Sequence, residues 1–191
     1  YDSGYTDGVA VSFESGYTSG YTVGFASGFT VGEMDYFYLE SNNGNAKVQM
    51  SKWGNPPSVS LEYSFDKINW TGWDLTEITL NQNNKKAYFR GDNPNGFSSS
   101  LANYRGFHIV GDVTMGGDIR SLINKAVTGD TVPVSYCFNR FVIYCNNLSV
   151  SPKLLSGYKN LTPYCYYGMF YQVYLKNAPE LPAKTLQPYC Y

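Results

Sequence analysis

The chain has 191 residues, a formal net charge of -1 and 15% charged residues. Binding to phosphates needs a surplus of Lys and Arg, so this balance argues against a nucleic-acid partner. No apolar run approaches the roughly 20 residues that cross a bilayer, and we expect no membrane span. The chain begins with Tyr1 and stops inside a repeat, so we expect a segment of a longer polypeptide.

Residues 1–33 repeat with a period of four. The glycines that share one phase are Gly4, Gly8, Gly16, Gly20, Gly24, Gly28 and Gly32. Each of the first six is followed by a bulky residue, and the central aromatic ones are Tyr17, Tyr21, Phe25 and Phe29. Residues four apart lie on one face of a helix, and in an extended chain they also share a face. In neither conformation does a single chain bury much apolar surface. We therefore predict an oligomerising stalk, helical or extended, and favour helices assembled between chains.

Residues 34–131 have the pattern of short β-strands separated by turns. Leu61, Tyr63 and Phe65 alternate with polar residues, as expected of a strand that is buried on one face. Clusters of Asn and Gly mark the turns. We predict a mainly β fold, with an antiparallel β-sandwich in this segment. One short helix is predicted over residues 118–126, with Asp118 at its N-terminus.

Residues 132–191 contain a second repeat, with a period near 25 residues. Three cysteines share one phase at spacings of 28 and 25 residues, and two pairs of leucines are 27 residues apart. Such a period is typical of solenoids, in which stacked units bury their apolar faces as ladders. The predicted ladder residues are Cys137, Cys165, Cys190, Leu148, Leu175, Leu154 and Leu181. We expect the cysteines to be free, buried thiols.

The unit YCYYGMF at residues 164–170, followed by NAPELPAKTL at residues 177–186, resembles the BspA-like leucine-rich repeats. These repeats occur in surface proteins of gut and oral bacteria and in fibre proteins of gut phages. Val173 departs from the family, which has Cys there, and one residue is missing nearby. In phage fibres of this type, glycine tetrads and a β domain commonly precede the repeats, in the order found here. The resemblance implies the start of a leucine-rich-repeat-like solenoid, displayed on a surface for recognition or assembly.

The sequence has no arrangement typical of an active site. His108 is the single histidine, and its alternating context favours a place on a sheet face over a role as general base. No Gly-x-Ser-x-Gly elbow, Cys-x-x-Cys pair or Cys/His cluster is present, so we predict no enzyme, no metal and no cofactor. The candidates for stacking on sugar rings are Trp53, Trp70 and Trp73. Their alternative place is the core of the sandwich.

Together these features predict an extracellular, structural and adhesive component of a phage virion fibre. Its partners are expected to be further copies of the chain, with a trimer implied by the resemblance, and a glycan or protein of the host surface. One alternative is a leucine-rich repeat adhesin on a bacterial cell surface. Another is a carbohydrate-binding module.

Overall fold

The computed structural model describes residues 34–191, and residues 35–191 form one compact unit. The tetrad repeat predicted over residues 1–33 lies outside the described residues. The strands are β1 (Phe37–Ser41), β2 (Asn45–Trp53), β3 (Leu61–Ser64), β4 (Thr71–Trp73), β5 (Ile78–Asn81), β6 (Lys86–Gly91), β7 (Tyr104–Val110), β8 (Asp112–Gly116), β9 (Val142–Val150) and β10 (Phe170–Leu175). Two short 3-10 turns are η1 (Ile119–Leu122) and η2 (Pro152–Leu155). The prediction of a mainly β fold is confirmed.

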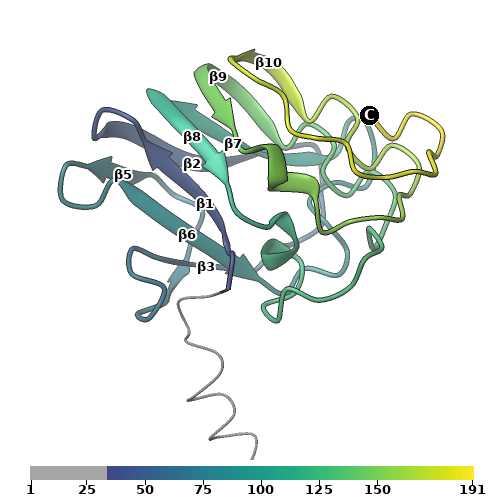
Figure 1. Cartoon of the computed structure of the whole chain (residues 1–191), viewed down its shortest axis with the longest axis horizontal. Coiled ribbons are helices and arrows are strands. Elements are labelled where there is room, and N and C mark those ends of the chain that lie inside the picture. The colour runs from purple at the N-terminus through teal and green to yellow at the C-terminus, as the bar shows by residue number, and fades with distance from the viewer. Residues whose placement is uncertain (1–33) are drawn as a thin grey trace, which may run out of the picture. The chain divides into compact units, whose positions relative to one another are not determined.

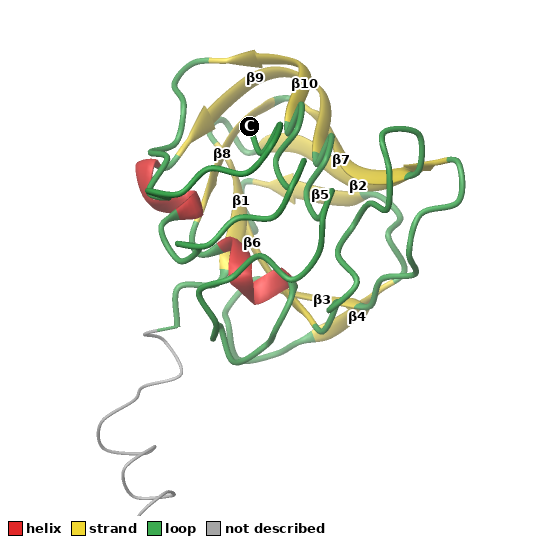
Figure 2. Cartoon of the chain, turned by 90° about the vertical axis from the view of Figure 1, so that its right-hand side faces the viewer, coloured by secondary structure: helices red, strands yellow, loops and turns green. Residues whose placement is uncertain are grey.

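All ten strands belong to one sheet, which curls into a half-barrel (Figures 1 and 2). Nine of them follow the order β4-β3-β6-β1-β8-β9-β7-β2-β5, and β10 pairs with β9. The antiparallel sandwich predicted for residues 34–131 therefore needs a correction, since its strands belong to one continuous sheet. The physical reason is β9, which runs parallel beside both β7 and β8 and joins the repeat segment to them.

A bend at Gly111 separates β7 from β8 and divides the sheet into two branches. Gly111 has a φ of +115°, and a Cβ there would lie 2.9 Å from the carbonyl oxygen of Asn45, so the bend requires glycine. On one side of the bend β7 pairs with β2, and on the other β8 pairs with β1. The branches face each other across the core, where the ring of Phe37 on β1 stacks on that of Phe107 on β7 at 5.5 Å.

The core is dominated by phenylalanine side chains that the strand alternation turns inward. Phe37, Phe89, Phe107 and Phe141 are fully buried and contact one another. Burial of one such side chain stabilises the fold by roughly 1.5–3 kcal/mol. The same cluster continues without a break past Val132, so the segments 34–131 and 132–191 share one core.

The helix predicted over residues 118–126 is shorter than expected. Asp118 does cap it, because its Oδ1 accepts a hydrogen bond from the Arg120 amide at 2.9 Å. The turn ends at Leu122, and Asn124 then accepts a bond from the Ala126 amide through its own side chain. Such side-chain turns compete with helix propagation.

Candidate functional site

The repeat segment stacks on the sheet in regular layers. We call residues 136–163 the first coil and residues 164–188 the second coil. The Phe138 amide donates to the Cys165 carbonyl at 2.8 Å, and the Tyr166 amide donates to the Cys190 carbonyl at 3.0 Å. The Phe97 amide donates in the same way to the Cys137 carbonyl, at 2.9 Å. The segment around Phe97 is therefore the layer on which the coils build.

An inner ladder of aromatic rings runs through these layers. The rings of Phe97, Phe138, Tyr166 and Tyr191 follow one another at 5.9, 5.6 and 5.8 Å. Their planes are inclined by 24°, 12° and 12°, so each ring lies nearly parallel to the next. Equivalent residues of successive coils therefore stack directly over one another.

An outer ladder of tyrosines runs along the corner of the coils. Tyr136, Tyr164 and Tyr189 stack at 4.7 and 4.8 Å. All three have positive φ angles, between 54° and 61°. This left-handed conformation is costly for a residue with a side chain. The stacked rings offset that cost and keep the corner aligned from coil to coil.

The predicted ladder residues occupy equivalent places in the coils. Cys137, Cys165 and Cys190 are buried and form no disulfide. Burial raises the pKa of the Cys165 thiol to about 11, so this thiol stays protonated at neutral pH.

The predicted ladder leucines differ in burial from coil to coil. Leu148 lies opposite Leu175 in the pairing of β9 with β10, and Leu154 is fully buried. Leu181 remains 56% exposed. The pairing slips between Val173 and Leu175, which locates the missing residue of the second unit.

A row of stacked side chains crosses the side of the sheet that faces away from the core. Trp53 stacks on Tyr104 at 5.1 Å, with an inclination of 12°. The guanidinium of Arg140 lies 5.0 Å from the Tyr104 ring and 4.6 Å from the Tyr171 ring. Such cation–π contacts hold the charge between two rings. The row thus joins β2, β7, the first coil and β10.

Exposed tyrosines continue this row along β9 and β10. Phe170, Val173 and Leu175 of β10 pack on the core, so Tyr171 and Tyr174 lie on the opposite side and are 42% and 72% exposed. Tyr144 of β9 is 51% exposed. We call Tyr144, Tyr171 and Tyr174 the tyrosine face.

The polar border of the tyrosine face comes from β2 and β7. The ring of His108 meets that of Tyr144 edge-on at 6.0 Å, and its Nδ1 lies 3.1 Å from the Gln49 amide nitrogen. His108 therefore lies on a sheet face, with a glutamine and a tyrosine as neighbours. Exposed phenol rings beside planar polar groups suit stacking and hydrogen bonding to a ligand.

The three predicted tryptophans occupy different environments. Trp53 belongs to the stacked row. Trp70 is half-buried, with the Arg90 guanidinium 4.0 Å above its ring. Trp73 is 7% exposed and its ring lies 5.8 Å from that of Phe107, so it belongs to the core. The structure therefore connects one tryptophan of the three to the tyrosine face, through Tyr104 and Arg140.

Sequence reasoning missed the tyrosine face itself. A usable signal was present, since Tyr144 neighbours the buried Cys145 and Tyr171 neighbours the half-buried Phe170 of the repeat. Strand alternation turns such neighbours to opposite sides of a sheet. The sequence does not show which face of the sheet packs on the core, so it does not show that these tyrosines are exposed.

Within residues 34–191, no group of three or more His, Cys, Asp or Glu side chains is placed to hold a metal ion. The same residues include no helix with the length and apolar character to span a membrane. Comparison of the chain with protein-family models, curated proteins and solved structures found no match.

Proposed function

We propose that the chain is a structural and recognition module of an extracellular fibre, and specifically a component of a phage virion fibre. The observation that carries the proposal is the tyrosine face, which exposes three aromatic side chains on the two paired strands β9 and β10. Exposed aromatic clusters of this kind are typical of interaction surfaces. The resemblance of the repeat to those of phage fibres supports the location on a virion.

The residues suit recognition of a glycan on the host surface. Phenol and indole rings offer flat apolar faces to sugar rings, and their hydroxyl groups remain free to bond. Arg140, His108 and Gln49 supply polar atoms at the border of the tyrosine face. The charge of the chain as a whole is close to zero, which favours a neutral ligand over a highly charged one.

Two other functions remain as alternatives to a virion fibre. A leucine-rich repeat adhesin on a bacterial cell would use the same surface for a protein or a glycan. A carbohydrate-binding module would use it for a polysaccharide. The neighbouring segments of the polypeptide distinguish the bacterial adhesin from a virion fibre, because a lipoprotein signal or a sorting tail would assign the chain to a cell surface.

The test of recognition is affinity electrophoresis of the chain through gels that contain soluble bacterial polysaccharides. We expect at least one polysaccharide to retard the wild type. Tyr171→Ala and Tyr174→Ala together should abolish the retardation while the chain stays folded, with a small fall in melting temperature from the lost contact of Tyr171 with Arg140. Phe65→Ala is a matched control, because Phe65 is an exposed aromatic residue outside the tyrosine face. Retardation that survives in the double variant would refute the proposed surface.

The test of assembly is the mass of the purified chain by light scattering. Residues 1–33 should associate chains, with a trimer implied by the resemblance. Replacement of Tyr17, Tyr21, Phe25 and Phe29 by serine should then reduce the mass. A wild-type chain with the 21.4 kDa mass of a monomer would refute the stalk.

A further inference from the structure

Arg140 has fewer hydrogen-bond partners than the other arginines of the chain. Each of the other three donates to a carboxylate or carbonyl oxygen, at 2.7, 2.9 and 2.6 Å, and these are Arg90, Arg105 and Arg120. Within residues 34–191, the one hydrogen bond of the Arg140 side chain is a long one, from Nη1 to the Tyr104 hydroxyl at 3.3 Å. No ion pair among those residues includes Arg140. This guanidinium therefore keeps donors that the fold does not use.

Two nitrogens of the Arg140 guanidinium make no hydrogen bond with any described residue. Nε is buried, whereas solvent reaches Nη2. The rings of Tyr104 and Tyr171 flank the group, with centroids 5.0 and 4.6 Å from its central carbon, and Arg140 is half-buried. A partly desolvated charge attracts an anion more strongly than a charge in bulk water. Nη2 is thus the donor through which Arg140 can bind an external anion.

Gly168 of the second coil occupies the place that Arg140 has in the first. Each lies three positions after the aligned cysteine of its coil, and both are left-handed, with φ of 55° and 49°. The Arg140 amide donates to the carbonyl of Tyr167, directly before Gly168, at 3.1 Å. A Cβ on Gly168 would lie 3.7 Å from Cγ of Arg140, so a longer side chain there would lie against the Arg140 stem. Glycine at this place leaves that stem uncovered.

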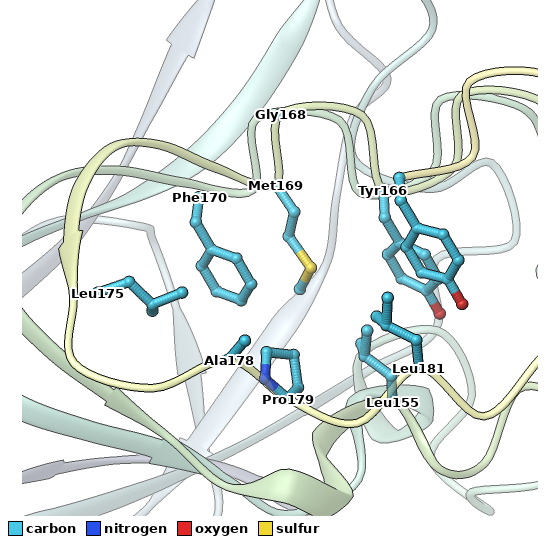
Figure 3. Close-up of a pocket in the computed structure, with 10 residues that line it drawn as sticks. Leu155, Tyr166, Gly168, Met169, Phe170, Leu175, Ala178, Pro179 and Leu181 are labelled. Carbon is cyan, nitrogen blue, oxygen red and sulfur yellow. The ribbon is translucent and has the colours of Figure 1, made fainter.

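The orientation of β10 places exposed tyrosines beside Arg140. Figure 3 shows Phe170 and Leu175 pointing into the second coil. Tyr171 and Tyr174 lie on the opposite side of the strand and are both exposed. A ligand that is held by Arg140 therefore lies next to phenol rings.

The charges around Arg140 select among ligands. Among the residues of the stacked row and the tyrosine face, Arg140 is the single Lys or Arg, and none is Asp or Glu. One cation balances one negative charge, and the planar guanidinium matches the planar oxygens of a carboxylate. The chain as a whole has no basic surplus, which makes it unsuited to a polyanion. The site therefore favours a glycan in which single carboxylates stand among neutral sugars.

We propose that the tyrosine face binds its glycan through a hexuronic acid, whose carboxylate accepts a hydrogen bond from Nη2 of Arg140. This inference rests on the proposed recognition of a glycan by that face. Neighbouring neutral sugars lie on the rings of Tyr144 and Tyr174. Arg140 then determines specificity, because a neutral hexose has no carboxylate to pair with it.

The test compares two matched glycosides as ligands of the full chain. Methyl glucuronoside has a carboxylate where methyl glucoside has a hydroxymethyl group. Nuclear magnetic resonance titration follows the Tyr171 ring and the Nε–H of Arg140. The glucuronoside should shift both signals and bind at least about tenfold more tightly than the glucoside, because hydrogen bonds between charged groups are the stronger ones. Equal affinities, or no shift with the glucuronoside, would overturn the proposal.

Two variants locate the carboxylate. Arg140→Gln should weaken binding of the glucuronoside by about tenfold, to the level of the glucoside. Arg90→Gln is the matched control and should bind like wild type. Arg90 also lies over an aromatic ring, that of Trp70 at 4.0 Å, but it is already paired with Glu62 at 2.7 Å. Unchanged binding by Arg140→Gln would contradict the proposal, and should that variant fail to fold, the wild-type shift of the Arg140 signal decides.

A carboxylate could also come from a protein partner, and N-acetylglutamate is the probe for that source. It carries the side-chain carboxylate of an acidic residue without a sugar ring. The glucuronoside should bind more tightly, because it adds contacts with the tyrosine rings. Tighter binding of N-acetylglutamate would assign the site to an acidic protein segment and overturn the hexuronic acid.

Failure of this inference is distinguishable from failure of the proposed function. Equal affinities for the two glycosides, together with polysaccharide retardation that the double tyrosine variant abolishes, would refute the hexuronic acid and preserve the glycan site. Glucuronoside binding that depends on Arg140, without retardation by any polysaccharide, would preserve the carboxylate contact and refute recognition of polysaccharides.

Discussion

Residues 35–116 and residues 136–191 both rely on aromatic side chains, but they pack them differently. In the two branches of the sheet, rings from distant strands meet at varied angles, from 21° for Trp73 and Phe107 to 71° for Phe89 and Phe107. In the coils, equivalent rings lie nearly parallel, such as 12° for Phe138 and Tyr166. In the sheet branches, the rings come from two surfaces that face each other. In the coils, equivalent rings are related by translation from one repeat unit to the next.

This difference in ring packing predicts how far the destabilisation caused by one substitution extends through the molecule. A ring in the branched core contacts several strands at once, so its loss should weaken the whole unit. A ring in a ladder contacts the coils directly before and after it. Loss of a ladder ring should therefore destabilise mainly the neighbouring coils. The loss of stability should be smaller for a ring at the end of a ladder.

The largest effect should come from Trp73→Ala. Truncation of a buried aromatic core residue costs about 3–5 kcal/mol of unfolding free energy. Trp70→Ala removes a half-buried ring that contacts Arg90 and Tyr36 and donates a hydrogen bond to the Lys67 carbonyl, for an expected loss of about 1–2 kcal/mol. Urea unfolding followed by circular dichroism measures both. Equal losses would contradict the burial difference between the two tryptophans.

The tyrosine ladder should show an effect of position. Within residues 34–191, Tyr164 stacks on two tyrosine rings and Tyr189 on one. Tyr164→Ala should therefore cost about 1–3 kcal/mol, and Tyr189→Ala about half as much. Both residues have positive φ, so the backbone contribution of the substitution largely cancels. If Tyr189→Ala were as destabilising as Tyr164→Ala, the ladder would not be the source of the stability.

A substitution at a corner of the second coil should cause a smaller loss of stability, which comes from backbone strain alone. Gly168 has a φ of +55°, and an added Cβ would meet just the Arg140 side chain, at the ordinary distance of 3.7 Å. Gly168→Ala should therefore cost about 1–2 kcal/mol through strain alone.

The control for that corner is Gly72→Ala in β4. Gly72 has open space around its Cβ position and no positive φ. Its replacement should leave the stability unchanged or raise it slightly. The thermal midpoints of the two variants, measured side by side, check the prediction, and a Gly168→Ala midpoint at or above wild type would contradict it.

The smallest effect is electrostatic and belongs to the sheet branches. Hydrogen bonds from Lys125 and Arg90 lower the pKa of the Glu62 carboxyl below its usual value of 4.5. Its contribution to stability is therefore complete above that value and is lost as the pH falls through the folded-state pKa.

Glu62→Gln should destabilise the protein at neutral pH by at most about 1 kcal/mol, because ion pairs that water still reaches contribute little. The difference from wild type should shrink as the pH is lowered below 4.5 and vanish below the folded-state pKa. Unfolding curves at several pH values check this. A difference that grows toward acid would have the wrong sign for a lowered pKa.

Much of the fold followed from local patterns. Alternation in Leu61 to Phe65 predicted a strand, and the structure has β3 over Leu61–Ser64. Asp118 was expected to cap a helix and caps a shorter turn. The sandwich was not predicted correctly in detail, because the pairing of β9 with β7 and β8 joins residues about 35 positions apart, which no local pattern encodes.

The candidate site was less accessible to sequence reasoning. Trp53, Trp70 and Trp73 look alike as candidates for ligand stacking, yet they lie on the stacked row, beside Arg90 and in the core. Tyr144, Tyr171 and Tyr174 carried no motif. Their exposure arises because the opposite side of β9 and β10 packs on the core.

By itself, the sequence determined the β character of the chain, the phase of the cysteines and leucines, and the absence of a basic surplus. These are properties of spacing and composition, which hold whatever the distant partners are. Only the tertiary structure decided that the two segments share one core and that the tyrosines point to solvent. Each of those depends on which surfaces meet, and surfaces separated by tens of residues meet through packing and strand pairing rather than through local preference.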